Sequence, residues 1–216
     1  MGISDLIVLS VVILYLAGML LIGWWCTGKI KGLSDFMVAG RRLGMVLATA
    51  TMFATWFGAC SSMGTAGTVY KQGLRGVISD PFGASLALIL AGIFYAVLFR
   101  RLRLLTVVDI FNSNYSKGTE IFAALLMIPV YIGWLGSQIV AIGFVFSAFT
   151  KIVVNLGMIM GTIVTLIYTY AGGMWAVTLT DFVQMIILIL GILIILPFSV
   201  NGAGGMANII MKTPKE

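Results

Sequence analysis

The fold is decided by the stretch FATWFGACSSMG, residues 53–64, which lies in the middle of a run without charged side chains. Arg42 and Lys71 bound this run, and it is 28 residues long. A helix needs about 20 apolar residues to cross the hydrocarbon core of a bilayer. The run is therefore long enough to span a membrane.

The composition of the same stretch argues against one regular helix. Gly58, Gly64 and Gly67 lower its helix propensity, and the nearby Ser and Thr side chains offer competing local hydrogen bonds. Irregular backbone at membrane depth survives only inside protein or beside a water-filled cavity, and transporters bind ions at such breaks. Two interpretations stay open on these residues alone: a broken span that binds a cation, or small residues that allow close helix packing.

The whole chain has the composition of an integral membrane protein. Hydrophobic residues make up 61% of it and charged residues 9%, whereas about 25% of a soluble domain is charged. The 13 Lys and Arg residues lie in clusters between apolar runs, which is typical of topology signals and not of a nucleic-acid surface. The sequence has no His, and its acidic residues are scattered, so neither a catalytic constellation nor a metal cluster is indicated. We expect no enzyme and no resident cofactor.

The apolar runs predict an all-α fold with six transmembrane helices. The first span covers residues 6–26, and the second is the broken run that ends near residue 70. The third covers residues 81–99, and Asp80 and Pro81 suit its start. The fourth covers residues 121–150 and is expected to kink at Pro129. Between the third and fourth, residues 104–117 have the pattern of an amphipathic interfacial helix.

The long apolar run at residues 152–200 must turn. Its 49 residues would extend roughly 74 Å as one helix, more than twice the thickness of a bilayer core. Gly172 and Gly173 predict a turn between a fifth span and a sixth. The predicted organisation is an extra N-terminal helix in residues 1–26, a basic loop in 27–43, a five-helix segment in 44–200 and a loose polar tail in 201–216.

The basic residues also predict an orientation. If the N-terminus is outside, the cytoplasmic loops hold Lys29, Lys31, Arg41, Arg42, Arg100, Arg101, Arg103 and Lys117. The outer side then holds Lys71, Arg75, Lys151, Lys212 and Lys215. Because cytoplasmic loops carry an excess of Lys and Arg, this count favours a cell-membrane protein with both termini outside.

Four segments in a fixed order carry a family resemblance. They are DFMVAGRRLG (residues 35–44), YKQGL (70–74), YAGGMWAV (170–177) and TDFVQ (180–184). Together they resemble the sodium:solute symporter family, of which this chain matches the first half. The resemblance implies a leucine-transporter-type fold, in which two five-helix repeats of inverted orientation follow one extra helix. The chain would then hold the extra helix and the first repeat.

The resemblance also implies a site. In the family, the broken first core helix offers backbone carbonyls to a sodium ion, and these fall at Ala54 and Phe57. The matching aspartate, Asp181, lies on the cytoplasmic sodium route. The positions that would face the central cavity and the solute are Thr55, Trp56, Gly58 and Ser61, and Asp80 matches an acid that contacts the sugar in one member. Some members have a polar or acidic residue where this chain has Trp56.

The two acidic positions have simpler alternatives. Asp80 suits a helix N-cap at the membrane interface better than a solute contact. Asp181 interrupts an apolar run, and a carboxylate within a membrane is costly enough that a functional or paired role is expected. Its alternative is solvation near the headgroups, eight residues after Gly173. We also expect Gly157 and Gly161 to form a helix-packing face.

The expected function is half of a sodium-coupled symporter for a small organic solute. In the family, hydroxyls from the second repeat complete the sodium site, so two carbonyls alone hold a dehydrated Na⁺ ion poorly. The expected partner is a separately encoded second repeat or a second copy inserted in the opposite orientation. The alternative is a non-transporting remnant, or a membrane sensing or assembly module derived from a symporter.

Overall fold

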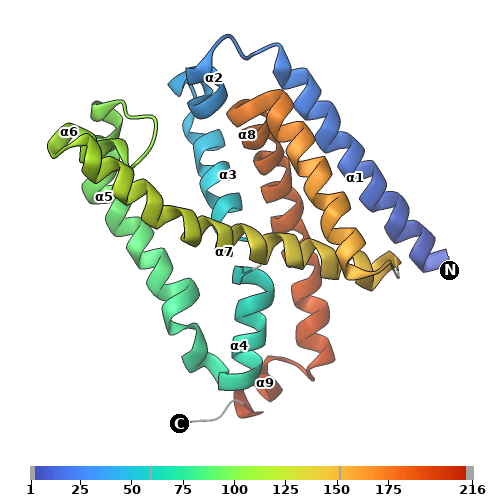
Figure 1. The fold of residues 1–216 in the computed structure, drawn as a ribbon. Helices are drawn as coiled ribbons and strands as arrows, with labels where there is room; N and C mark the ends of the chain where they lie inside the picture. Colours follow the sequence, from blue (N-terminus) through green and yellow to red (C-terminus); the bar gives the residue numbers. More distant parts are fainter. Residues whose placement is uncertain (1–2, 59, 151, 213–216) are drawn as a thin grey trace. The chain divides into compact units, whose positions relative to one another are not determined.

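The computed structural model describes residues 3–58, 60–150 and 152–212, and all regular elements among them are helical (Figure 1). Lys151 and Lys215, which enter the orientation count, lie outside the described residues. The four longest helices are α1 (Ile3–Thr27), α5 (Ala84–Leu102), α7 (Lys117–Thr150) and α8 (Val154–Gly202). The shorter elements are α2 (Leu33–Val38), η1 (Ala39–Arg41), α3 (Met45–Trp56), η2 (Cys60–Gly64), α4 (Thr65–Gln72), η3 (Gly73–Val77), η4 (Ile78–Gly83), α6 (Asp109–Asn114) and α9 (Met206–Lys212).

Several helices are long and apolar enough to cross a membrane. In the described part of the chain, four qualify by themselves: Leu6–Thr27, Arg75–Leu102, Lys117–Thr150 and Val154–Gly202. The pair Met45–Trp56 and Ser61–Gln72, bent by 55°, adds a fifth if it is one broken span. These helices make the chain a multi-pass membrane protein, while the count of six spans stays a prediction.

The 49-residue helix α8 contains the turn that its length requires. Gly173 has φ 50° and ψ −148°, which are not helical angles, so α8 divides there into two helical segments. Side chains other than hydrogen rarely adopt this backbone conformation. The turn predicted from Gly172 and Gly173 is thus found at Gly173.

The chain forms two compact units, which we describe separately. Unit 1 comprises Met1–Leu43 and Ile89–Val177, and unit 2 comprises Gly44–Leu88 and Thr178–Glu216. In unit 1, α1 packs closely on α8, because a Cβ atom on Gly23 would lie 2.7 Å from the Cβ of Tyr168. α8 packs equally closely on α7 in this unit. A Cβ on Gly157 would lie 2.8 Å from the Cβ of Phe146, and one on Gly161 would overlap Ile142, which confirms the predicted packing face.

Two of the segments that carry the family resemblance meet in unit 1. Phe36, in residues 35–44, backs onto Gly173, in residues 170–177, where a Cβ would lie 2.7 Å from the Phe36 ring. The first segment is held by an ion pair in which Arg42 Nη2 lies 2.8 Å from Asp35 Oδ1. The Lys31 amide also donates to Asp35 Oδ2 (3.2 Å). These residues therefore brace the basic loop against the α8 turn.

Four segments differ from the sequence predictions. Residues 73–83, expected as a polar connection and a helix start, form η3 and η4, so α5 begins only at Ala84. α7 begins at Lys117 and continues through Pro129. The tail contains the short helix α9.

The amphipathic helix expected at residues 104–117 is also shorter, because α6 begins only at Asp109. The Asp109 carboxylate accepts hydrogen bonds from the Leu105 amide (3.0 Å), the Thr106 amide (2.9 Å) and the Thr106 hydroxyl (2.5 Å). These bonds fix a turn before α6, which shows how a short polar side chain competes with helix formation.

Candidate cation and solute site

The helix of the quoted stretch breaks in unit 2 directly after Trp56. α3 ends there, and Phe57 follows with φ −78° and ψ 63°, so its carbonyl leaves the helical direction. In a continuous helix the Gly58 amide would donate to the Ala54 carbonyl. It donates instead to the Trp56 carbonyl, at 2.8 Å. The Ala54 carbonyl thus loses its helical donor.

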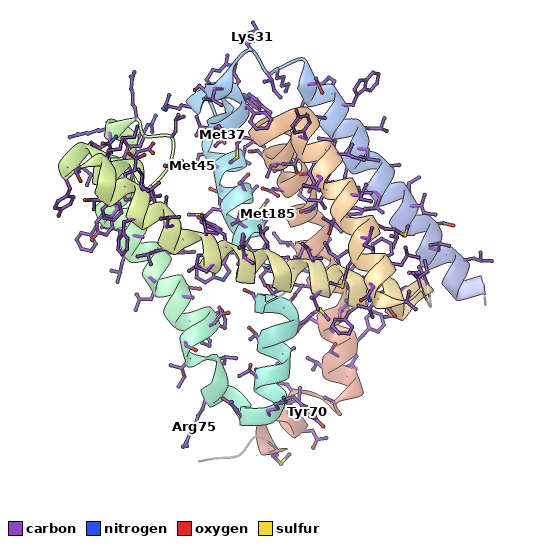
Figure 2. The ribbon with its side chains drawn as sticks, in the orientation of Figure 1. Lys31, Met37, Met45, Tyr70, Arg75 and Met185 are labelled. Carbon is purple, nitrogen blue, oxygen red and sulfur yellow. The ribbon has the colours of Figure 1, made fainter. Side chains whose placement is uncertain are left out.

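Two serine hydroxyls stabilise the backbone at the break. Ser61 Oγ donates to the Trp56 carbonyl (3.0 Å), and Ser62 Oγ donates to the Gly58 carbonyl (2.9 Å). The chain then continues through η2 and α4. Figure 2 shows Met45, at the start of α3, at one end of unit 2 and Tyr70, on α4, toward the other end. The two helical pieces therefore follow one another across unit 2.

Asp181 of α8 lies against α3 in unit 2. Its carboxylate interacts with the Thr51 hydroxyl. Thr51 Oγ1 and Asp181 Oδ2 are both buried, and neither forms a hydrogen bond of normal geometry with the described residues. Thr51 precedes Ala54 by three residues, which places both on one face of α3 about 4.5 Å apart along its axis. The structure thus brings Asp181 within one helical turn of Ala54.

A cavity of about 300 Å³ lies between α3 and the start of α5 in unit 2. One face of α3 supplies Thr49, Met52, Phe53 and Trp56, which follow the i, i+3, i+4, i+7 spacing of a helix. The Phe53 and Phe57 rings stack at a centroid distance of 5.6 Å with 10° between their planes. The remaining lining residues are Phe57, Pro81, Ser85 and Leu88. The lining is mostly aromatic and apolar.

The other predicted solute positions have varied surroundings. Thr55 is exposed and lies outside the cavity lining, and Gly58 lies half-buried in the bend. The Ser61 hydroxyl is engaged with the backbone, as described above. Asp80 is half-buried with φ −140° and ψ 118°, and its Oδ1 has no hydrogen-bond partner among the described residues. Because α5 begins at Ala84, Asp80 is not the N-cap of that helix.

The sequence analysis did not single out six residues of this region, namely Thr49, Thr51, Met52, Phe53, Ser85 and Leu88. The 3.6-residue period nevertheless places Met52 and Phe53 on the same helix face as Trp56. The position of Thr51 beside Asp181 has no such signal, because the two residues are distant in sequence.

The comparisons with known proteins identify the family. The family model described as "Sodium:solute symporter family" matches residues 36–215. The chain belongs to this family.

The human high affinity choline transporter 1 is one of the relatives. It is 30% identical over 204 residues, which cover 89% of this chain and 34% of the transporter. The osmoregulated proline transporter OpuE of Bacillus subtilis (strain 168) is 28% identical over 206 residues, covering 90% of this chain and 41% of that protein. The sodium/pantothenate symporter of Escherichia coli (strain K12) is 26% identical over 182 residues, covering 82% and 38%. This symporter-family chain spans about a third of the length of the choline transporters it matches.

Proposed function

We propose that this chain contributes the cation site of a sodium-coupled symporter. The observation that carries the proposal is the position of the Asp181 carboxylate, beside Thr51 and one turn from the Ala54 carbonyl, to which the Gly58 amide does not donate. Carbonyl, hydroxyl and carboxylate oxygens are the ligands that hard cations prefer. At a break in a membrane helix some backbone carbonyls have already lost their helical hydrogen bonds, so a cation can bind them without breaking any more. Ala54, Phe57 and Asp181 are therefore the proposed cation ligands.

We further propose an organic cation as the solute. Aromatic side chains attract cations through the negative face of the ring, and quaternary ammonium groups are bound in aromatic cages. Phe53, Trp56 and Phe57 line the cavity on α3, and this supports a choline-like solute. The named choline transporters among the relatives support the same class. Thr55, Gly58, Ser61 and Asp80 stay candidate solute contacts.

The proposed symporter acts with a second polypeptide. The Ala54 and Phe57 carbonyls and the Asp181 carboxylate, even with the neighbouring Thr51 hydroxyl, offer Na⁺ fewer ligands than a dehydrated hard cation takes from a protein. A second-repeat subunit, or a second copy of this chain in the opposite orientation, would supply the missing oxygens. The contact between Arg41 Nη2 and the Arg103 carbonyl (2.6 Å) supports placing residues 27–43 and 100–117 on one side of the membrane. Their basic residues favour the cytoplasm, with both termini outside.

Sodium-driven uptake into proteoliposomes tests the proposal. The chain is reconstituted alone, or with a candidate second-repeat subunit, and radiolabelled choline, proline and pantothenate are offered with an inward Na⁺ gradient or an equal K⁺ gradient. We expect Na⁺-dependent uptake with choline preferred, and at least a tenfold loss in Asp181→Asn. Asp109→Asn, the same chemical change at a half-buried position outside the proposed site, is the matched control and retains uptake.

Two outcomes contradict the proposal at different levels. If Asp181→Asn and a bulky Ala54→Leu leave coupled uptake unchanged, the assigned ligands are wrong although the chain transports. If no pairing gives Na⁺-dependent uptake of any of the three solutes, the non-transporting alternative is favoured.

A further inference from the structure

A second cavity, in unit 1, has a different chemistry. It has a volume of about 370 Å³, and three arginines line it: Arg41, Arg100 and Arg103. Arg41 ends η1, Arg100 lies in the last turn of α5, and Arg103 directly follows α5, so the fold brings together basic side chains about 60 residues apart in sequence. We call this the arginine cavity. Its apolar lining residues are Val38, Leu43, Phe99 and Leu104.

The lining of the arginine cavity is positively charged and includes no acidic residue. No Asp or Glu is among its lining residues, and the Arg42–Asp35 ion pair of the described chain includes none of the three arginines. Like charges that share one cavity repel each other. Guanidinium groups also match phosphate geometry, because they donate two parallel hydrogen bonds to its oxygens. The cavity is therefore suited to an anion, and to a phosphate in particular.

The backbone at two of these arginines is held in a rare conformation. Arg41 has φ 55° and Arg103 has φ 52°, in the left-handed region that residues with a side chain seldom adopt. The same two residues are joined by the hydrogen bond from Arg41 Nη2 to the Arg103 carbonyl. Strained residues of this kind gather at sites that must hold side chains in a defined place. A charge cluster that served only as a topology signal would need no such geometry.

The apolar lining identifies the source of the phosphate. Phe99 and Arg100 lie at the end of Arg75–Leu102, a segment long and apolar enough to cross a membrane, so the cavity lies at the membrane interface. Free phosphate gains nothing from contact with Val38 or Leu104, whereas the glycerol and acyl portions of a lipid do. Basic pockets at helix ends on the cytoplasmic side bind anionic headgroups. We propose that the arginine cavity binds the phosphate of an anionic phospholipid. The proposal does not depend on transport or on the cation site.

Native mass spectrometry of the purified chain tests this proposal. Phosphatidylglycerol is titrated into the full chain in micelles that contain phosphatidylcholine, and the bound lipid is counted. We expect saturable binding of phosphatidylglycerol, weakened roughly fivefold by Arg100→Gln. Arg100→Lys keeps the charge but loses the paired hydrogen bonds, so we expect an intermediate loss. The matched control is Arg101→Gln, since Arg101 is adjacent in sequence but lies outside the lining, and it should bind like the wild type.

Each remaining outcome overturns the proposal. Equal losses in Arg100→Gln and Arg101→Gln mean that diffuse charge attracts the lipid and no cavity binds it. Equal binding by Arg100→Lys and wild type means that charge alone retains the lipid, so the phosphate is not held by the guanidinium groups of the arginine cavity. Displacement of the lipid by millimolar inorganic phosphate identifies free phosphate, and not lipid, as the ligand. Because the lysine variant keeps the charge of the helix end, the test stays decisive even if Arg100→Gln folds poorly.

Discussion

The substitution Gly173→Ala tests the turn that divides α8. An alanine there must adopt φ 50° and ψ −148°, a region that is nearly exclusive to glycine and costs about 1–3 kcal/mol. Its Cβ would also lie 2.7 Å from Cδ2 and 2.8 Å from the carbonyl oxygen of Phe36. Overpacking of this kind costs about 1–3 kcal/mol. The two effects together predict a loss of roughly 2–6 kcal/mol in the free energy of unfolding.

Thermal denaturation in detergent, followed by size-exclusion chromatography with fluorescence detection, measures this loss. For a chain of this size 1 kcal/mol corresponds to about 2–4 °C in Tm, so the lower estimate predicts a decrease of about 4–8 °C. The matched control is Gly191→Ala in the same helix, where a Cβ would meet no atom within 4 Å. Alanine improves helix propensity there by up to about 1 kcal/mol, so its Tm should stay the same or rise.

The reasoning is refuted if the two variants have the same Tm. A double-mutant cycle with Phe36→Ala separates the two contributions. Removal of the ring should recover part of the loss, because the ring atom at 2.7 Å is gone. The remainder should persist, since the Phe36 carbonyl is backbone and the dihedral strain is unchanged.

Two other predictions concern packing and pH. Gly161→Leu should weaken the contact between α7 and α8 by about 1–3 kcal/mol, because even a Cβ would overlap Ile142. The same melting assay measures this loss, with Gly191→Leu as the control. Equal Tm values for the two variants would contradict the prediction. The hydrogen bonds from Thr106, its hydroxyl first, lower the pKa of Asp109 below its usual 3.8. A lowered pKa stabilises the turn above pH 3.8 and loses this effect as the pH falls through the folded-state pKa. Hydrogen exchange of the Thr106 amide should therefore be faster in Asp109→Asn than in wild type at about pH 6, with the difference vanishing at low pH; a constant difference would contradict the assignment.

Glycine positions made much of this fold predictable from sequence. The break after Trp56 and the turn at Gly173 both occur where glycine removes the preference for helix, in runs whose length already required an interruption or a turn. The close packing at Gly157 and Gly161 follows from the same residue type. These features are local, so a single sequence contains their cause. The family resemblance also predicted the membership that the matched residues establish.

Other features depend on contacts that no local pattern contains. Thr51 and Asp181 are neighbours only because α8 packs on α3 within unit 2. Helix periodicity could have added Met52 and Phe53 to the predicted cavity, since both share the face of Trp56. The late start of α6 at Asp109 accompanies three hydrogen bonds from residues three and four positions earlier to one carboxylate, a local side-chain geometry that hydrophobic periodicity does not contain. Amphipathic patterning alone predicts a helix across that turn.

The hydrogen bonds at the break stabilise some of its carbonyls and leave another without its helical donor. Hydroxyls of Ser61 and Ser62 donate to the carbonyls of Trp56 and Gly58, so part of the irregular backbone is satisfied by its own side chains. The Gly58 amide turns to Trp56, which leaves the Ala54 carbonyl without its helical donor. An unpaired carbonyl at membrane depth is costly unless another group or an ion meets it. The serine side chains therefore stabilise the break, while the Ala54 carbonyl that loses its helical donor lies one helical turn from Thr51, the residue with which Asp181 interacts.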